Sequence, residues 1–274
     1  MYSFADIYKQ QIEFNFSKSP YIKNFKKYPY SFVKSRYYIF FGTCLVYILQ
    51  NTNILPNTVT KLYILFGVIA AFLLALPYEE AHYVALFMIF SKGILDWTDG
   101  QLARVKKKTS LTGHILDTYG ALIHSISFII ALGIYQYYYL NNIWFLFALF
   151  IYPFCAGTLL TRFSYRYIYD DLSNDKYVAE ISSKEKIEKN PITSKYKVYV
   201  NFFANFLDDR SRTIDIVCLI ILLEHFDYPS LSWLFFVAVN IKWMILWLGS
   251  FYVSSSNNWA DNMVVSKIKK IKDV

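Results

Sequence analysis

Long apolar runs constrain the fold of this 274-residue chain more than any other feature of its sequence. The run over 62–78 contains no charged residue. It approaches the length of about 20 mostly apolar residues that a membrane-spanning helix needs. Hydrophobic residues make up 55% of the chain and charged residues only 18%, below the roughly 25% charged residues of an average soluble domain. A soluble fold would expose large apolar patches, so the sequence predicts an all-α, polytopic membrane helix bundle.

Six segments are predicted to span the membrane. They are 59–78, 82–102, 113–138, 143–163, 213–227 and 229–253. The segment 37–52 is also apolar, but it is short and follows a basic stretch, so we expect an amphipathic helix in the cytoplasmic interface there, with a seventh span as the alternative. We treat the chain as one integral membrane domain, with an N-terminal segment (1–54), a bundle (55–253) and a basic tail (254–274).

The distribution of basic residues predicts how the bundle is oriented. The net charge is +8, yet the predicted outer turns over 79–81, 139–142 and 225–229 contain no Lys or Arg. Basic residues concentrate in cytoplasmic loops of membrane proteins, so both termini and the loop 164–212 are expected in the cytoplasm, as in a bacterial inner membrane or its equivalent. This pattern accounts for the positive charge without nucleic acid as a partner. Four lysines of the tail are placed against anionic lipid or in solvent: Lys267, Lys269, Lys270 and Lys272.

The three cysteines exclude two other classes of protein. Cys44, Cys155 and Cys218 are far apart and form no CxxC pair. The spacing therefore predicts neither a disulfide scaffold nor a cysteine-rich zinc site.

Three aspartates near the cytoplasmic ends of the second and third predicted spans are the main candidates for chemistry. Asp96 and Asp99 are three residues apart and share a helix face, and Asp117 comes early in the next span. Carboxylates that converge in this way repel one another unless a cation lies among them, and hard divalent ions prefer oxygen ligands. Arg104 and the lysines over 106–108 lie on the same side and can neutralise phosphate. The pattern predicts a metal–diphosphate site, the alternative being that the acids only end a helix.

The same residues resemble a known motif. Asp96-Trp97-Thr98-Asp99-Gly100-Gln101-Leu102-Ala103-Arg104, followed after eight residues by Gly113 and after three more by Asp117, resembles the motif of the CDP-alcohol phosphatidyltransferases. The segment Pro56-Asn57-Thr58-Val59-Thr60 resembles the PNxxT that often opens the first span of that family. The resemblance implies a membrane transferase that moves a phospho-alcohol from a CDP-linked donor to an acceptor hydroxyl and releases CMP. Such a reaction belongs to phospholipid or related glycolipid and polysaccharide biosynthesis.

The resemblance also implies roles for individual residues. Asp96, Asp99 and Asp117 would hold Mg²⁺ or Mn²⁺ on the diphosphate. The implied nucleotide-binding residues are Asn57, Thr60, Gly100, Ala103, Arg104 and Gly113. The implied partners are the CDP-linked donor, a lipid or small-molecule acceptor and membrane lipids. Bundles of this kind often pair, so a homodimer is open, and the motif does not distinguish one donor alcohol or acceptor from another.

One position departs from the motif. The family's fourth aspartate, its expected general base, is replaced here by Ala121. His124 follows on roughly the same helix face as Asp117, and a neutral imidazole is a plausible base near pH 7, so His124 is the candidate catalytic base. The alternative for His124 is a bond to a neighbouring helix. The alternative for the whole chain is a non-catalytic member that binds a CDP-compound or lipid as a partner subunit or sensor; a transporter is less favoured, because the acids lie at the membrane edge.

Overall fold

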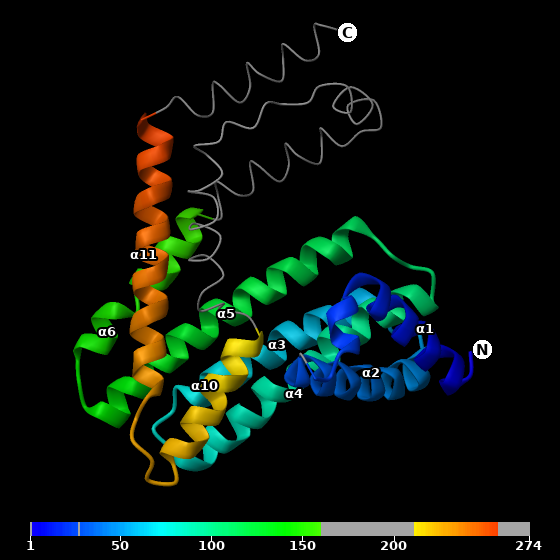
Figure 1. Ribbon diagram of the computed structural model, residues 1–274, viewed down its shortest axis with the longest axis horizontal. Helices are drawn as coiled ribbons and strands as arrows, with labels where there is room; N and C mark the ends of the chain where they lie inside the picture. The colour runs from blue at the N-terminus through cyan, green and yellow to red at the C-terminus, as the bar shows by residue number, and fades with distance from the viewer. Residues whose placement is uncertain (1, 27, 160–210, 257–274) are drawn as a thin grey trace, which may run out of the picture.

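The computed structural model describes residues 2–26, 28–159 and 211–256, and these residues form helices and connecting turns without a strand (Figure 1). The helices are α1 (Phe4–Lys18), the short 3₁₀ helix η1 (Pro20–Lys23), α2 (Pro29–Leu49), α3 (Pro56–Leu74), α4 (Glu79–Val105), α5 (Leu111–Leu140), α6 (Trp144–Ala148), α10 (Ser211–Glu224) and α11 (Ser232–Ser256). A further helical stretch covers 151–159. The predicted all-α class is confirmed.

Four of the described helices are long and apolar enough to cross a membrane. They cover Pro29–Leu49, Pro56–Leu74, Thr112–Leu140 and Ser232–Tyr252. The prediction of a membrane helix bundle is confirmed, whereas the number of six spans is not established by these four. The predicted span 143–163 corresponds in its described part to α6 and the stretch over 151–159, because 160–163 lie outside the described residues. The predicted inner loop as far as 210 and the lysines of the tail also lie outside them.

Helix α2 covers most of the segment that we expected to lie in the interface. It begins at Pro29 and has 21 residues, with the length and apolarity of a span. It lies along α4, where the Tyr38 hydroxyl donates to the Phe90 carbonyl at 3.0 Å and Gly42 faces Gln101. This arrangement along the bundle fits the alternative of a seventh span, and the membrane placement of 37–52 stays a prediction. The separate helix α1 precedes it, begun by a capping box between Ser3 and Asp6.

Helix α3 packs against both α4 and α5 and holds these two helices together (Figure 1). A small residue is required at one contact between α3 and α5. A Cβ atom at Gly120 of α5 would lie 2.1 Å from the hydroxyl oxygen of Tyr63 on α3, nearer than real Cβ atoms come to such an atom. Gly120 therefore lets the two helices approach, and the fully buried Tyr63 fills the space that this contact leaves.

The largest apolar core lies at the end of the bundle opposite the α4–α5 turn. Its fully buried members include Phe128 and Leu132 of α5, Ile221 of α10 and Phe236 of α11. The buried Glu224 ends α10 there and accepts hydrogen bonds from Tyr135, Ser230, Leu231 and Ser232. The Nδ1 atom of His82, at the start of α4, lies 3.2 Å from the Nε2 atom of His225. The turns after α3 and after α10 therefore lie at the same end of the bundle. Their position on the outer side of a membrane stays a prediction.

Candidate functional site

The candidate site lies where the C-terminal end of α4 turns into the N-terminal end of α5. Helix α4 ends at Val105, and Lys107 takes a left-handed conformation with φ of 52°. Ser110 then caps α5, because its side chain accepts a hydrogen bond from the Gly113 amide at 3.0 Å. The short connection brings the motif residues of both helices to one end of the bundle, as the sequence predicted.

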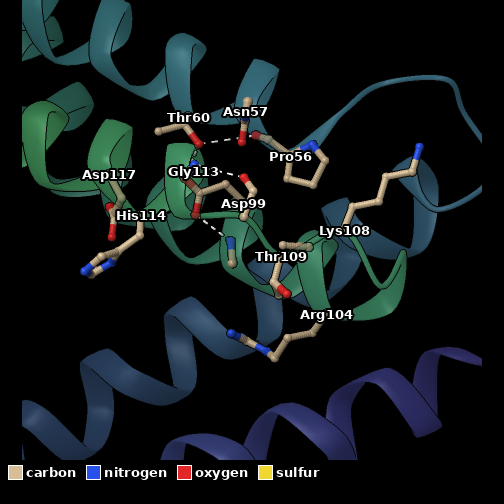
Figure 2. A pocket seen from close by; sticks show the side chains of 13 residues that line it. Pro56, Asn57, Thr60, Asp99, Arg104, Lys108, Thr109, Gly113, His114 and Asp117 are labelled. Carbon is tan, nitrogen blue, oxygen red and sulfur yellow. Dashed lines mark hydrogen bonds between the residues drawn. The ribbon is translucent and has the colours of Figure 1, made fainter. Parts of the chain in front are cut away.

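A pocket of about 210 Å³ opens between this turn and the start of α3 (Figure 2). Its lining comes from α3, α4, α5 and the α4–α5 turn, and consists of Pro56, Asn57, Thr60, Asp99, Gly100, Ala103, Arg104, Lys108, Thr109, Ser110, Gly113, His114 and Asp117. All the residues that the sequence assigned to nucleotide binding line this pocket, together with two of the three predicted metal ligands. Their roles in binding stay predictions.

Asp99 is held in place by helix α3. It is 7% exposed, and its Oδ2 atom accepts a hydrogen bond of 2.7 Å from the hydroxyl of Thr60, which is itself buried. The other oxygen, Oδ1, accepts the amide of Gly100. The sequence assigned Thr60 to the nucleotide; the structure places its hydroxyl on the aspartate.

Asp117 is supported by a residue that the sequence analysis missed. The Tyr63 hydroxyl donates to the backbone carbonyl of Asp117 at 2.8 Å and lies 3.5 Å from the carboxylate atom Oδ1. Tyr63 comes two turns into α3 and is separated from Asp117 by 54 residues, so no local spacing links the two. The one available signal was that Thr60 and Tyr63, three residues apart, share a face of α3.

Asp96 is not among the residues that line the pocket. Its carboxylate interacts electrostatically with Lys92, one turn earlier on α4, and with Asp117 and Asp99. Lys34 of α2 forms a buried ion pair with Asp215 of α10. The charges of both residues also act on Lys92. The Tyr30 hydroxyl also contacts Asp215.

The chemistry of these donors fits a hard divalent cation. The three aspartates supply only oxygen ligands, and among the described residues no Lys or Arg nitrogen comes within 4 Å of their carboxylates. Within the same part of the chain, however, no three acidic, His or Cys side chains gather into a complete ligand set. Asp99 and Asp117 line the pocket, and the carboxylate of Asp96 interacts electrostatically with both of them.

Basic residues border the other side of the pocket. The Arg104 guanidinium, labelled in Figure 2, donates from its Nη2 atom to Gln11 of α1 at 2.6 Å. Lys108 lines the pocket, whereas the Lys106 ammonium donates to the carbonyls of Thr52 and Ile54 at 2.7 and 2.8 Å. Partial burial, together with the neighbouring charge of Lys108, lowers the pKa of Lys106. Lys106 thus fixes the chain ahead of α3, and Arg104 and Lys108 provide positive charge to the pocket.

His124 and Ala121 differ sharply in solvent exposure. Ala121 is exposed, one turn beyond Asp117. His124 is 2% exposed and lies against Gly67 of α3, and it does not line the pocket. The face of α5 that is open at Asp117 is covered at His124, where α3 lies against the ring at Gly67. Neither ring nitrogen has a hydrogen-bond partner among the described residues, and the base role of His124 stays a prediction.

The chain was compared with known families and proteins. The family model described as CDP-alcohol phosphatidyltransferase matches residues 53–206, more than half of the chain, and the match includes α3, α4, α5 and every residue that lines the pocket. No curated protein matches the chain. The family suggested by the motif is therefore confirmed, and the chain belongs to the CDP-alcohol phosphatidyltransferase family.

Proposed function

We propose that this protein moves a phospho-alcohol from a CDP-linked donor to an acceptor hydroxyl and releases CMP. The family consists of membrane transferases associated with phospholipid synthesis, which supports the general class. The observation that carries the specific reaction is the pocket between α3, α4 and α5, which has carboxylates on one side and cationic side chains on the other. A nucleotide diphosphate bridged by a divalent cation has the complementary distribution of charge.

The family generally uses divalent metal ions, and Asp96, Asp99 and Asp117 would hold Mg²⁺ or Mn²⁺ here. When bound, such an ion offsets the charge of the diphosphate and stabilises the negative charge on the departing CMP. Thr60 restricts the rotation of the Asp99 side chain, so the carboxylate is already oriented before a ligand arrives.

The remaining pocket residues would accommodate and neutralise the donor. Gly100, Ala103 and Gly113 leave room for a nucleotide, since none carries a side chain larger than a methyl group. Asn57 lies directly against Gly113, with its Oδ1 atom 3.0 Å from the position of an added Cβ atom. Arg104 and Lys108 supply the positive charge that the donor phosphates require.

The acceptor hydroxyl must lose a proton as its oxygen bonds to phosphorus, and Ala121 cannot accept that proton. We propose His124 as the base. The support is that its ring nitrogens are without partners among the described residues, and that it follows Asp117 by two turns on the same helix. This role requires the acceptor hydroxyl to reach His124 beyond the pocket, where the ring lies against Gly67 of α3.

A second candidate function is binding of a CDP-compound without turnover, as a partner subunit or sensor. It is favoured by one observation: Asp99 and Asp117 are the only acidic residues lining the pocket in the described part of the chain, and the exposed position one turn beyond Asp117 carries an alanine. Such a protein would keep metal-dependent affinity for the nucleotide.

The test is release of CMP by the purified protein in detergent with Mn²⁺, a panel of CDP-alcohols and a panel of lipid and alcohol acceptors. Asp99→Asn is the matched negative control. Metal-dependent release that the control lacks supports the transferase. Metal-dependent CDP binding without release from any donor supports the non-catalytic alternative, and absence of both refutes the two proposals together.

A further inference from the structure

The N-terminal helix α1 contacts a motif residue although it precedes the region matched by the family model. The Oε1 atom of Gln11 accepts the hydrogen bond of 2.6 Å from Nη2 of Arg104. The ring of Phe14, on the same face of α1, has its centroid 3.9 Å from the guanidinium carbon. The guanidinium is therefore held by an amide at one nitrogen and by an aromatic ring against its plane.

The position of α1 is itself well fixed, so it can hold another side chain. Ile7 is fully buried and packs with Val46, Val59 and Leu102, which come from α2, α3 and α4. The backbone of Tyr2 exchanges two hydrogen bonds of 3.1 Å with the side chain of Gln50, at the end of α2. Contacts to three helices leave α1 little freedom to move relative to the pocket.

Two other donors of Arg104, Nη1 and Nε, are not used by this contact. The Nη1 atom lies 3.4 Å from where a Cβ atom would stand on Gly100, which lines the pocket. The Nε donor is buried and has no acceptor among the described residues, and the same is true of the Nε2 donor of the fully buried Gln11. Because glutamine is neutral, it orients the guanidinium without neutralising its charge.

We propose that Gln11 and Phe14 are positioning residues that hold Arg104 ready for a phosphate of the donor nucleotide, so that α1 forms part of the donor site. This inference rests on the proposed function. A free arginine side chain loses rotamer freedom when it binds a ligand. An arginine already held by α1 has less to lose, and the donor binds more tightly as a result.

A double-mutant cycle tests this inference with the full-length protein in detergent. The probe is CDP in the presence of Mg²⁺, measured by isothermal titration calorimetry. Gln11→Leu keeps the size of the side chain and removes the acceptor for Arg104. We expect it to weaken CDP binding about tenfold, the effect of one lost charge-assisted hydrogen bond. Gln10→Leu, at the exposed neighbouring position, is the matched control and should bind like wild type.

In an Arg104→Leu background, Gln11→Leu should not weaken CDP binding further, because Gln11 acts on the ligand only through Arg104. In the transfer reaction, Gln11→Leu should raise the KM for the donor and leave the KM for the acceptor unchanged. Gln11→Asn withdraws the acceptor by one methylene group but keeps its polarity, and it should reproduce the loss even if the leucine variant does not fold.

An equal loss of affinity in both backgrounds would mean that Gln11 acts through the general fold, and it would overturn the inference. So would wild-type affinity in both Gln11 variants. If wild-type protein itself binds no CDP with Mg²⁺ or Mn²⁺, the proposed function fails, and this inference fails with it.

Discussion

The hydrogen bond between Thr60 and Asp99 gives a quantitative prediction for Thr60→Val. Valine has nearly the shape of threonine but lacks the hydroxyl that donates to Asp99 Oδ2 at 2.7 Å. The carboxylate would keep only the Gly100 amide, on its other oxygen, and would no longer be held toward α3. A hydrogen bond to a charged group contributes about 1.5–3 kcal/mol. Loss of a residue that orients a metal ligand typically costs about 10- to 100-fold in metal affinity, and the two ranges agree at about 1.4 kcal/mol per tenfold change.

We therefore expect the Mn²⁺ concentration that half-saturates CDP binding to rise by about 10- to 100-fold in Thr60→Val. Calorimetric titration of CDP at a series of Mn²⁺ concentrations measures this value directly. Thr60→Ser keeps the hydroxyl and should remain close to wild type. Thr58→Val places the same change at an exposed position of α3 and controls for the loss of a threonine from this helix.

The prediction separates two roles for Thr60. If Thr60 contacts the nucleotide directly, the valine variant should lose CDP affinity equally at all Mn²⁺ concentrations, including saturating ones. If it orients Asp99, high Mn²⁺ should restore CDP binding. Wild-type dependence on Mn²⁺ in Thr60→Val would refute the reasoning.

Four further changes test other parts of the structure. Asp99→Asn should abolish metal-dependent CDP binding while the protein still folds; wild-type affinity in Mg²⁺ would exclude Asp99 as a ligand. His124→Ala should lower kcat for CMP release by about 10²- to 10⁴-fold with CDP binding retained, and adding Ala121→Asp should restore part of the rate; an unchanged kcat would remove His124 as the base. Gly120→Ala should lower the free energy of unfolding by about 1–3 kcal/mol, measured by denaturation in detergent, because its Cβ atom would clash with a buried tyrosine; unchanged stability would contradict that contact. A cysteine in place of the exposed Tyr78 should react with an impermeant thiol reagent in intact cells, and protection there would contradict the predicted orientation.

The candidate site was largely predictable because its residues are close together in the sequence. Asp99, Gly100 and Arg104 lie within two turns of α4, and Gly113 and Asp117 lie one turn apart on α5, so helical periodicity alone predicts which faces they share. A short connection between the two helices then brings those faces to the same end of the bundle. The pocket follows from these local rules once the segments are known to be helical.

The supporting contacts were not predictable, because they depend on how the helices pack. Tyr63 and Asp117 are 54 residues apart, Gln11 and Arg104 are 93 apart, and no spacing rule connects either pair. His124 shows the same limit: periodicity places it on the face of Asp117, but the close approach of α3 at Gly67 covers it. Periodicity along one helix does not show where a second helix crosses it.

The ion pair between Lys34 and Asp215 has a consequence for how the protein is made. The two residues are 181 positions apart, so α2 is synthesised long before its acidic partner on α10. Until α10 arrives, the lysine is a charge without its counter-ion in or near the bilayer. The acid lies near one end of the described part of α10, Ser211–Glu224. An unpaired buried charge costs about 3–5 kcal/mol, so the packing of α2 around Lys34 is completed only once α10 has been made.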